Sequence, residues 1–104
     1  MKDDPLTLIA GIDRTIHAPA RLSILACLAA VKTGDFTFLL NQTGLTRGNL
    51  SANLGKLEEA GYVSIKKEFV EKIPRTLIRL TAKGRKALTA YCNDMQFVIE
   101  NLGG

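Results

Sequence analysis

The sequence predicts one domain of the α+β class, in which helices predominate and a single β-hairpin interrupts them. Three observations support this prediction. Apolar residues recur at helical spacing through most of the chain, but between residues 63 and 80 they alternate with polar residues, as in strands. Glycine separates two short helical segments in the middle of the chain. The length of 104 residues is close to the commonest size of one domain.

Two helices are expected before residue 33. Residues 4–16 form the first, with Asp4 as its cap and Pro5 at its first position. Pro19 opens the second, which runs to about Lys32 and is apolar around much of its circumference, so we expect it at the centre of the core. Thr33-Gly34-Asp35 then breaks the pattern, and the next two residues begin either a very short strand or the next helix.

The middle of the chain has the pattern of a helix-turn-helix. Residues 38–43 make a helix of about two turns, and Gly44 provides the permissive backbone of a tight turn. Thr46 is a good N-cap for the next helix, which ends before Gly61. One narrow apolar stripe runs along this helix: Leu50, Leu54 and Leu57. The helix is therefore held by one face and presents the other, and we call it the reading helix.

The presented face of the reading helix is small and polar. It carries Gly48, Asn49, Ala52, Gly55 and Lys56, with Ser51 and Asn53 on its flanks. Two interior glycines cost about 1 kcal/mol each relative to alanine. Such a face suits a DNA major groove, where Asn bonds adenine edges and Lys, Arg47 and Ser meet phosphates or guanine. The alternative is a surface helix of poor intrinsic propensity.

A β-hairpin follows the reading helix directly. One face of its first strand carries Val63, Ile65 and Phe69, and Thr76, Ile78 and Leu80 alternate along the second. We expect a loop of several residues at 70–74, because Pro74 lacks an amide donor. A hairpin in this position is a wing, whose Lys72 and Arg75 would reach phosphates or a minor groove. An ordinary charged hairpin would have the same residues.

The chain closes with a long amphipathic helix, about residues 82–101, capped by Thr81. Residues 20–80 already supply a core, so part of the apolar stripe on this helix stays uncovered together with the first helix. Pairing of two copies as a two-fold homodimer is the simplest way to cover this apolar surface. The expected interface comprises Leu6, Ile9, Ile12, Leu88, Tyr91, Met95, Val98, Ile99 and Leu102. The alternative is a monomer whose terminal helices fold back on the core.

Positive charge is concentrated on the reading helix, the wing and the start of the last helix. Residues 47–86 hold ten of the fourteen Lys and Arg and four of the ten Asp and Glu, a balance of +6. The rest of the chain holds four basic and six acidic residues, a balance of −2. This distribution is expected for a protein that contacts a polyanion, although a solvated basic surface would give it too.

Catalysis, metal binding and membrane insertion have little support in the sequence. Cys27 and Cys92 lie in apolar helical contexts, so we expect buried free thiols. His17, the only histidine, is expected to pack or cap, and no metal or cofactor motif is present. No paired carboxylates, nucleophile elbow or phosphate loop indicate an enzyme. The longest apolar run, residues 22–31, is too short for a bilayer and the N-terminus lacks a signal-peptide pattern, so we expect a cytoplasmic protein.

Three strings in order resemble bacterial and archaeal winged-helix transcriptional regulators of the MarR/ArsR-like superfamily. They are IHAPARLSILACLA at 16–29, FTFLLNQTGLTRGNLSANLGKLEEAGYV at 36–63 and PRTLIRLTAKGRKAL at 74–88. The resemblance covers about residues 14–92. It implies a winged helix-turn-helix with a three-helix core, a two-stranded wing and long terminal helices for dimerisation. Within the single domain of residues 1–104, the N-terminal helix occupies residues 1–17, the winged-helix core residues 18–81 and the C-terminal dimerisation helix residues 82–104.

The resemblance also implies a function, namely a homodimer that places two reading helices in successive major grooves of a pseudo-palindromic operator. Carried over by position, the DNA contacts are Thr46, Arg47, Asn49, Ser51, Asn53, Lys56, Lys72 and Arg75. Relatives often have histidine where this chain has Asn53, so the operator sequence stays open. Cys27, Cys92 and His17 do not form the ligand cluster of a metal sensor, and no pattern reveals a pocket for a small-molecule effector. The competing function is a winged-helix module that binds protein instead of DNA.

Overall fold

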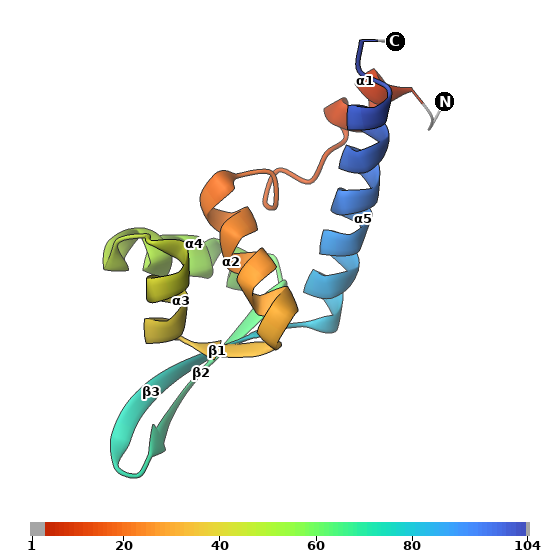
Figure 1. The fold of residues 1–104 in the computed structure, drawn as a ribbon. Coiled ribbons are helices and arrows are strands. Elements are labelled where there is room, and N and C mark those ends of the chain that lie inside the picture. Colours follow the sequence, from red (N-terminus) through yellow and green to blue (C-terminus); the bar gives the residue numbers. More distant parts are fainter. Residues whose placement is uncertain (1–3, 104) are drawn as a thin grey trace.

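A computed structural model describes residues 4–103. The elements in chain order are α1 (Pro5–Ala10), α2 (Pro19–Val31), β1 (Thr33–Asp35), α3 (Phe36–Thr43), α4 (Arg47–Glu59), β2 (Val63–Val70), β3 (Ile73–Leu80) and α5 (Ala82–Glu100). The strands form one antiparallel sheet in the order β1-β3-β2. Helices α2, α3 and α4 gather beside the base of this sheet, the β2–β3 hairpin projects away from them, and α5 extends on the opposite side (Figure 1). The predicted α+β fold with three core helices and a wing is confirmed.

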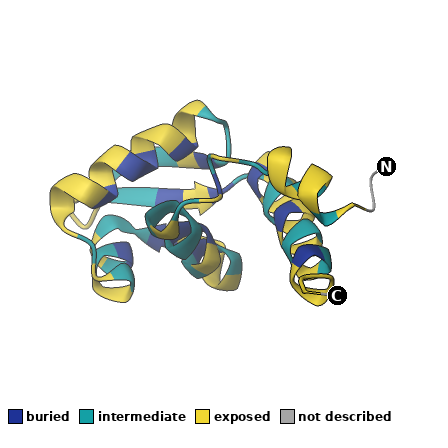
Figure 2. Ribbon diagram, turned by 90° about the horizontal axis from the view of Figure 1, so that it is seen from above, coloured by how far each residue is buried: buried dark blue, intermediate teal, exposed yellow. Residues whose placement is uncertain are grey.

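The core surrounds α2, as the apolar character of that helix predicts. Its largest fully buried side chains come from four elements and the segment before α2: Ile16, Ile24, Leu25, Leu28, Leu39, Leu50, Leu57 and Ile78. Figure 2 shows buried residues on the inner sides of the helices and exposed residues on their outer sides. The stripe predicted for the reading helix, which is α4, is therefore confirmed as the face that holds this helix on the protein.

The first helix is shorter than predicted. Asp4 caps it as expected, but α1 ends at Ala10, and Gly11 is its C-cap. The residues predicted to continue the helix instead form a turning segment, residues 11–18, which we call the linker. Within the linker the carboxylate of Asp13 accepts two main-chain N–H groups. Such local bonds compete with helical ones, which explains why the apolar spacing did not produce a longer helix.

Residues 33–35 form a strand that the sequence pattern did not reveal. β1 pairs with residues 77–79 of β3, with Gly34 opposite Ile78. A strand of three residues is too short for its alternation to be recognised. The helix after it begins at Phe36, two residues before the predicted start, because the carboxylate of Asp35 caps it.

The wing has a two-residue turn, so the predicted loop of several residues is wrong. Strand pairing continues to Val70 and Ile73, and only Glu71 and Lys72 form the turn. Both have positive φ, 52° and 68°, as a type I′ hairpin turn requires. Pro74 remains in β3 one pair beyond the turn. Its missing N–H donor is not needed there, because antiparallel pairs alternate between hydrogen-bonded and non-bonded, and β1, the other neighbour of β3, does not extend that far.

A close contact joins the start of α5 to the end of α4. Thr81 caps α5 by accepting from the main-chain nitrogen of Gly84, and its hydroxyl donates to the main-chain oxygen of Gly61 at 2.7 Å. The main-chain nitrogen of Thr81 donates to the oxygen of Tyr62 at 3.0 Å. Gly84 packs so closely that an added Cβ would overlap that same oxygen. We call these four residues the α4–α5 joint.

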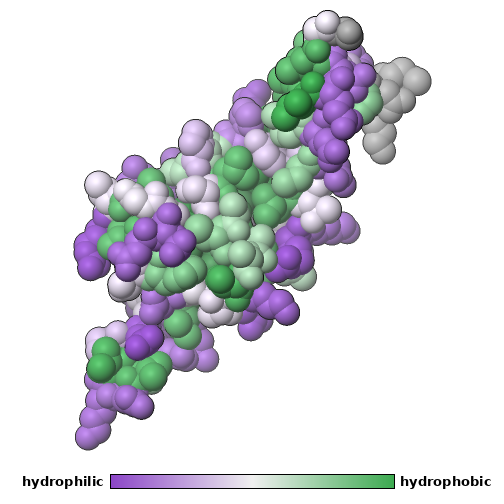
Figure 3. All heavy atoms as spheres, viewed as in Figure 1, coloured by the Kyte–Doolittle hydropathy of each residue, from purple (hydrophilic) through white to green (hydrophobic). Residues whose placement is uncertain are grey.

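The residues predicted for a dimer interface fall into two groups. Tyr91 and Val98 are buried within the chain, and Ile12, Leu88 and Met95 pack partly against its core. For Tyr91 and Val98 the predicted exposure is wrong, because α1 and the linker fold onto α5. The other four are exposed at the far end of α5 and on α1: Leu6 (73%), Ile9 (43%), Ile99 (63%) and Leu102 (61%). Figure 3 shows apolar surface at this end of the molecule.

The two cysteines differ in exposure. Cys27 is partly buried, as predicted, but Cys92 is exposed on α5, so the prediction of two buried thiols is wrong for Cys92; neither forms a disulfide. Within residues 4–103, no three His, Cys, Asp or Glu side chains gather as a metal ion would need. None of the helices in the same range combines the length and apolarity needed to cross a membrane.

Candidate nucleic-acid interface

The outward face of α4 is small, polar and open to solvent. Gly44, with φ of 70°, makes the turn before α4, and the hydroxyl of Thr46 accepts from the main-chain nitrogen of Asn49 at 3.2 Å. The residues predicted for this face are all exposed: Gly48, Asn49, Ser51, Ala52, Gly55 and Lys56. A Cβ added at Gly48 or Gly55 would meet nothing within 4 Å. Packing inside the chain therefore does not require glycine there, whereas close approach of a partner would.

Asn53 is the exception among the predicted contacts on α4. It is only 9% exposed, and its Oδ1 accepts from Nη1 of Arg21 at 3.0 Å. Its Nδ2 donates to the main-chain oxygen of Asn49 at 2.8 Å and to Oδ1 of Asn49 at 2.6 Å. The structure does not present Asn53 to a partner as the prediction requires, because its amide is buried and bonded at both ends within the chain.

Arg21 is a site residue that sequence reasoning missed. Besides Asn53, its guanidinium reaches the linker, where Nε donates to the main-chain oxygen of Thr15 and Nη2 to that of Arg14. Arg21 therefore ties the linker to the reading helix. The only signal in the sequence is a charged residue within the first turn of a mostly apolar helix, and nothing there indicates its partner 32 positions later.

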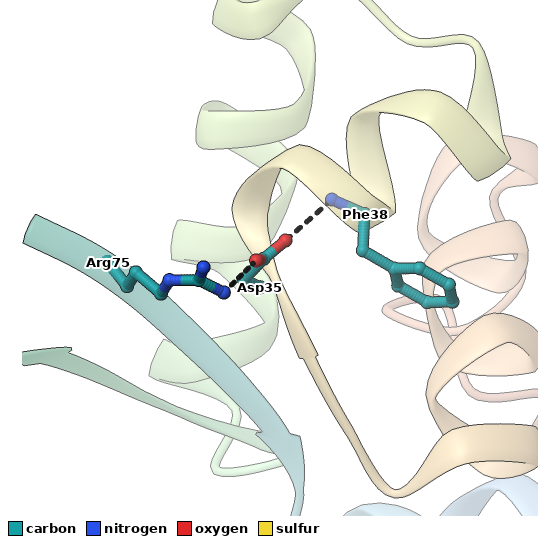
Figure 4. Close-up of polar contacts among 3 residues, drawn as sticks. All are labelled: Asp35, Phe38 and Arg75. Atoms are coloured by element: carbon teal, nitrogen blue, oxygen red, sulfur yellow. Dashed lines mark hydrogen bonds and ion pairs between the residues drawn. The ribbon is translucent and has the colours of Figure 1, made fainter. Parts of the chain in front are cut away.

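The wing places Lys72 in its exposed turn and Arg75 closer to the body. Nη1 of Arg75 lies 3.3 Å from Oδ2 of Asp35. The other oxygen of Asp35 accepts from the main-chain nitrogen of Phe38 at 2.7 Å, so one carboxylate both caps α3 and holds the wing (Figure 4). Arg75 remains half-exposed despite this pair. Its guanidinium thus has further N–H donors for an anion outside the chain.

Most of the basic charge around α4 and the wing is not neutralised by the chain itself. Among residues 4–103 the ion pairs are Lys66–Glu68 and Arg75–Asp35. Eight of the ten basic residues between positions 47 and 86 are therefore outside any ion pair. The guanidinium of Arg47, in the first turn of α4, lies over the ring of Phe36 at 5.9 Å, a contact that positions this side chain without neutralising its charge.

Residues 20–99 match the family of the winged helix DNA-binding domain. The chain belongs to this family. An uncharacterised protein of Methanocaldococcus jannaschii is 34% identical over 86% of this chain and 97% of its own length. An uncharacterised HTH-type transcriptional regulator of Mycobacterium tuberculosis is 32% identical over 98% of this chain and 94% of its own length. The resemblance to winged-helix regulators that the three strings indicated is confirmed.

Solved structures show the same winged-helix fold. A transcriptional regulator homologue from Pyrococcus horikoshii superimposes with a TM-score of 0.87 at 26% identity, covering 96% of this chain and 98% of that one. The transcriptional repressor CouR, solved on a 23-mer DNA duplex, gives a TM-score of 0.73 at 26% identity, covering 96% of this chain and 71% of that one. This chain is therefore a winged-helix DNA-binding protein of the transcriptional-regulator kind.

The linker also supports the base of the wing in this winged-helix domain. The hydroxyl of Tyr62, one residue before β2, donates to Oδ2 of Asp13. This hydrogen bond, followed by burial and the nearby charge of Asp13, raises the pKa of Tyr62 to about 12. Burial, with a smaller contribution from Cys92, also raises the pKa of Tyr91, whose hydroxyl lies 2.8 Å from Nδ1 of His17. The two tyrosines thus anchor the linker to the wing and to α5.

The raised pKa of Tyr62 predicts a pH dependence of stability. Because the folded pKa lies above the ordinary value of 10.0, the hydrogen bond stabilises the folded state fully below pH 10, and this contribution is lost as the pH rises to about 12. In urea unfolding, the stability difference between wild type and Tyr62→Phe should be about 1 kcal/mol at pH 8 and should shrink towards pH 12. A constant difference over that interval would contradict this assignment.

Proposed function

We propose that the protein regulates transcription by binding a pseudo-palindromic operator as a homodimer. The observation that supports this most is the open face of α4, which combines glycine, amide, hydroxyl and cationic groups with no packing partner of its own. Its capped N-terminus also provides free main-chain N–H groups for a phosphate. The proposed contacts are Thr46, Arg47, Asn49, Ser51 and Lys56 on α4, and Lys72 and Arg75 in the wing. Asn53 is left out because it is buried.

The proposed contacts fall into two classes, those that meet phosphates and those that meet base edges. Arg47, Lys56 and Lys72 are cations suited to phosphates, which position the protein on any duplex. Asn49 is a neutral hydrogen-bonding side chain in the first turn of α4, the part of a reading helix that reaches base edges. Sequence preference would therefore come mainly from Asn49, whereas affinity and its salt dependence would come from the basic side chains.

This division predicts different outcomes for two single substitutions. Lys56→Ala should weaken binding to operator and random duplexes alike and reduce the slope of log affinity against log salt by about 1 per contact, hence about 2 per dimer. Asn49→Ala should keep that slope and relax preference at one base pair of each half-site. Fluorescence anisotropy on both duplexes across a salt series measures both quantities. Equal losses on the two duplexes for both variants would refute the division.

The dimer would form through α1 and the far end of α5. Four exposed apolar side chains gather there, and an apolar groove of about 640 Å³ lies beside them between α1, the linker and α5. Pairing of two such ends about a two-fold axis would cover this surface and fix the separation of the two α4 helices. The proposed interface residues are Leu6, Ile9, Ile99 and Leu102.

A charge placed on this surface tests the dimer. We expect wild type to sediment at twice its chain mass of 11.3 kDa, and Ile99→Asp to sediment as a monomer with a weakened affinity for the operator. Because Ile99 is exposed, the Ile99→Asp monomer should remain folded, which thermal unfolding of this variant would show. Gln96→Asp, one turn earlier at an exposed polar position, is the matched control and should remain a dimer. A wild-type monomer bound singly to DNA would refute the proposal.

One observation favours the competing function, a module that binds protein. The wing tip is apolar on both faces, with Phe69 75% and Ile73 58% exposed, and Figure 3 shows this apolar cluster at the end of the hairpin. Exposed apolar patches mark contact surfaces of several kinds. Binding to random duplex that is absent even at low salt would support the protein-binding function over the regulator.

A further inference from the structure

We infer that Arg21 and Asn53 are positioning residues that orient the amide of Asn49, so that this side chain offers DNA its N–H donors and keeps its oxygen turned inward. The inference rests on the proposed function, because it assumes that α4 reads base edges. It goes further by stating which base edges Asn49 accepts. The inference is based on a chain of hydrogen bonds that runs from the linker through Arg21 of α2 to the first turn of α4.

The orientation of Asn53 follows from the chemistry of Arg21. A guanidinium has only donors, so the atom of Asn53 that lies 3.0 Å from Nη1 must be the amide oxygen. The guanidinium itself cannot turn away, because Nε and Nη2 are bonded to main-chain oxygens of the linker. Asn53 is therefore left with its Nδ2 group directed back along α4 towards Asn49.

The orientation of Asn49 follows in turn from that of Asn53. Nδ2 of Asn53 is a donor, and its first acceptor is the main-chain oxygen of Asn49, which agrees with the assignment. Its second contact, at 2.6 Å, is with the side-chain amide of Asn49, and two donors cannot bond each other. The contacting atom must be Oδ1. The Nδ2 group of Asn49 is then the end of the amide that is free to meet a partner.

The main chain around Asn49 is fixed as well. Its nitrogen donates to the hydroxyl of Thr46, and its oxygen accepts from Asn53. Among residues 4–103, every buried side-chain nitrogen and oxygen has a hydrogen-bond partner, so no buried group of the network is left unpaired in this arrangement. Asn49 is exposed on a helix whose first turn is held at both sides, and its amide is oriented before DNA arrives.

This orientation changes which base Asn49 prefers. A free asparagine bonds adenine through two atoms, with its oxygen accepting from N6 and its nitrogen donating to N7. Oδ1 of Asn49 is turned inward to Asn53, so the end of the amide that meets DNA is the Nδ2 group with its N–H donors. In the major groove, guanine offers such donors two acceptors, O6 and N7, and thymine offers O4. Adenine offers N7 alone, beside an amino donor, and the edge of cytosine presents an amino donor. Asn49 therefore favours guanine or thymine and rejects cytosine, and adenine keeps only the hydrogen bond to N7 of the two that a free asparagine makes.

The first experiment uses the wild-type protein, so folding of a variant does not enter. Selection from random duplexes with wild type and Asn49→Ala identifies the base pair whose preference depends on Asn49. We expect guanine or thymine there. Replacing a preferred guanine by 7-deazaguanine, which lacks the N7 acceptor, or a preferred thymine by a 4-deoxy analogue lacking O4, should weaken binding about 5- to 10-fold, the effect of one hydrogen bond. Replacing an adenine by purine at the same place should leave affinity within about twofold, since the lost amino group has no acceptor on Asn49.

The second experiment reverses the orientation. In Asn53→Asp, the carboxylate still accepts from Arg21 but has no donor for Asn49, so the amide of Asn49 turns to donate inward and presents its oxygen. Preference at that base pair should move to cytosine or adenine, whose edges carry amino donors. Asn93→Asp on the exposed surface of α5 makes the same chemical change outside the network and should leave preference unaltered.

The outcomes separate the inference from the proposed function. Enrichment of no sequence by wild type would refute the proposed function, and the inference with it. A sequence in which the Asn49-dependent base is cytosine, or in which Asn49→Ala alters no position, would refute the inference alone. So would strong weakening on purine substitution, or a folded Asn53→Asp protein with the wild-type preference. If Asn53→Asp fails to fold, the base-analogue result decides.

Discussion

The affinity of the protein for its operator should fall about 10⁴-fold when monovalent salt is raised from 50 to 200 mM. Each protomer offers four basic side chains to phosphates, namely Arg47, Lys56, Lys72 and Arg75, so a dimer offers eight. At about 0.9 released counterions per contact, log affinity falls with log salt at a slope of about −7, and a fourfold change in salt gives the stated loss.

Anisotropy of a labelled operator duplex across that range measures the slope. Arg75 deserves a separate comparison, because its pairing with Asp35 means that a phosphate must compete with or share that carboxylate. Arg75→Ala should therefore reduce the slope less than Lys56→Ala does. A slope shallower than about −2 for wild type would mean that the unpaired basic surface does not contact the backbone of DNA, and would favour the protein-binding function.

Gly84→Ala should destabilise the folded protein by about 3 kcal/mol, the upper part of the range for inserting atoms into a well-packed site. The added Cβ would overlap the main-chain oxygen of Tyr62 and approach the side chain of Leu80. A main-chain atom cannot rotate aside as a flexible side chain does, so the α4–α5 joint would have to open. Urea unfolding monitored by circular dichroism gives the free energy directly.

The same substitution at another glycine provides the control. Gly55→Ala lies on the open face of α4, where an added Cβ has no neighbour within 4 Å, and it should stabilise the helix by about 0.5–1 kcal/mol. If the free energy of unfolding falls for Gly84→Ala and rises for Gly55→Ala, then steric contact, and not intrinsic helix propensity, determines the effect at Gly84. Two stabilising changes would contradict the close packing of the joint.

Elements that carry their own start and stop signals were predicted well. Pro19 opens α2, Thr46 caps α4 and Thr81 caps α5, and each of these helices lies within a residue or two of its predicted bounds. The open face of α4 followed from helical geometry alone. These features depend on residues a few positions apart, so the local sequence contains the information that determines them.

Features that depend on distant contacts were missed. β1 exists because β3, more than forty residues later, provides its hydrogen bonds. Asn53 lies beside the leucine stripe and spacing alone left it on a flank, but Arg21 from α2 supplies the buried partner that draws its amide inward. The early end of α1 likewise reflects bonds that Asp13 makes within the linker and to Tyr62. The spacing of apolar residues within one segment does not indicate which distant segment it will contact.

The α4–α5 joint also constrains how such a protein can evolve. From Gly84 to Ile99 the helix rises about 22 Å, and each inserted residue would add 1.5 Å and turn everything beyond it by about 100°. A substitution along α5 leaves this geometry in place, but a single insertion or deletion would swing the proposed dimer contacts to a different side relative to α4. A change in the length of the wing would move the hairpin and the proposed contact of Lys72, but it would leave the separation of the two α4 helices unchanged. The length of α5 would then be inherited together with the spacing of the operator half-sites, whereas the length of the hairpin is not tied to that spacing.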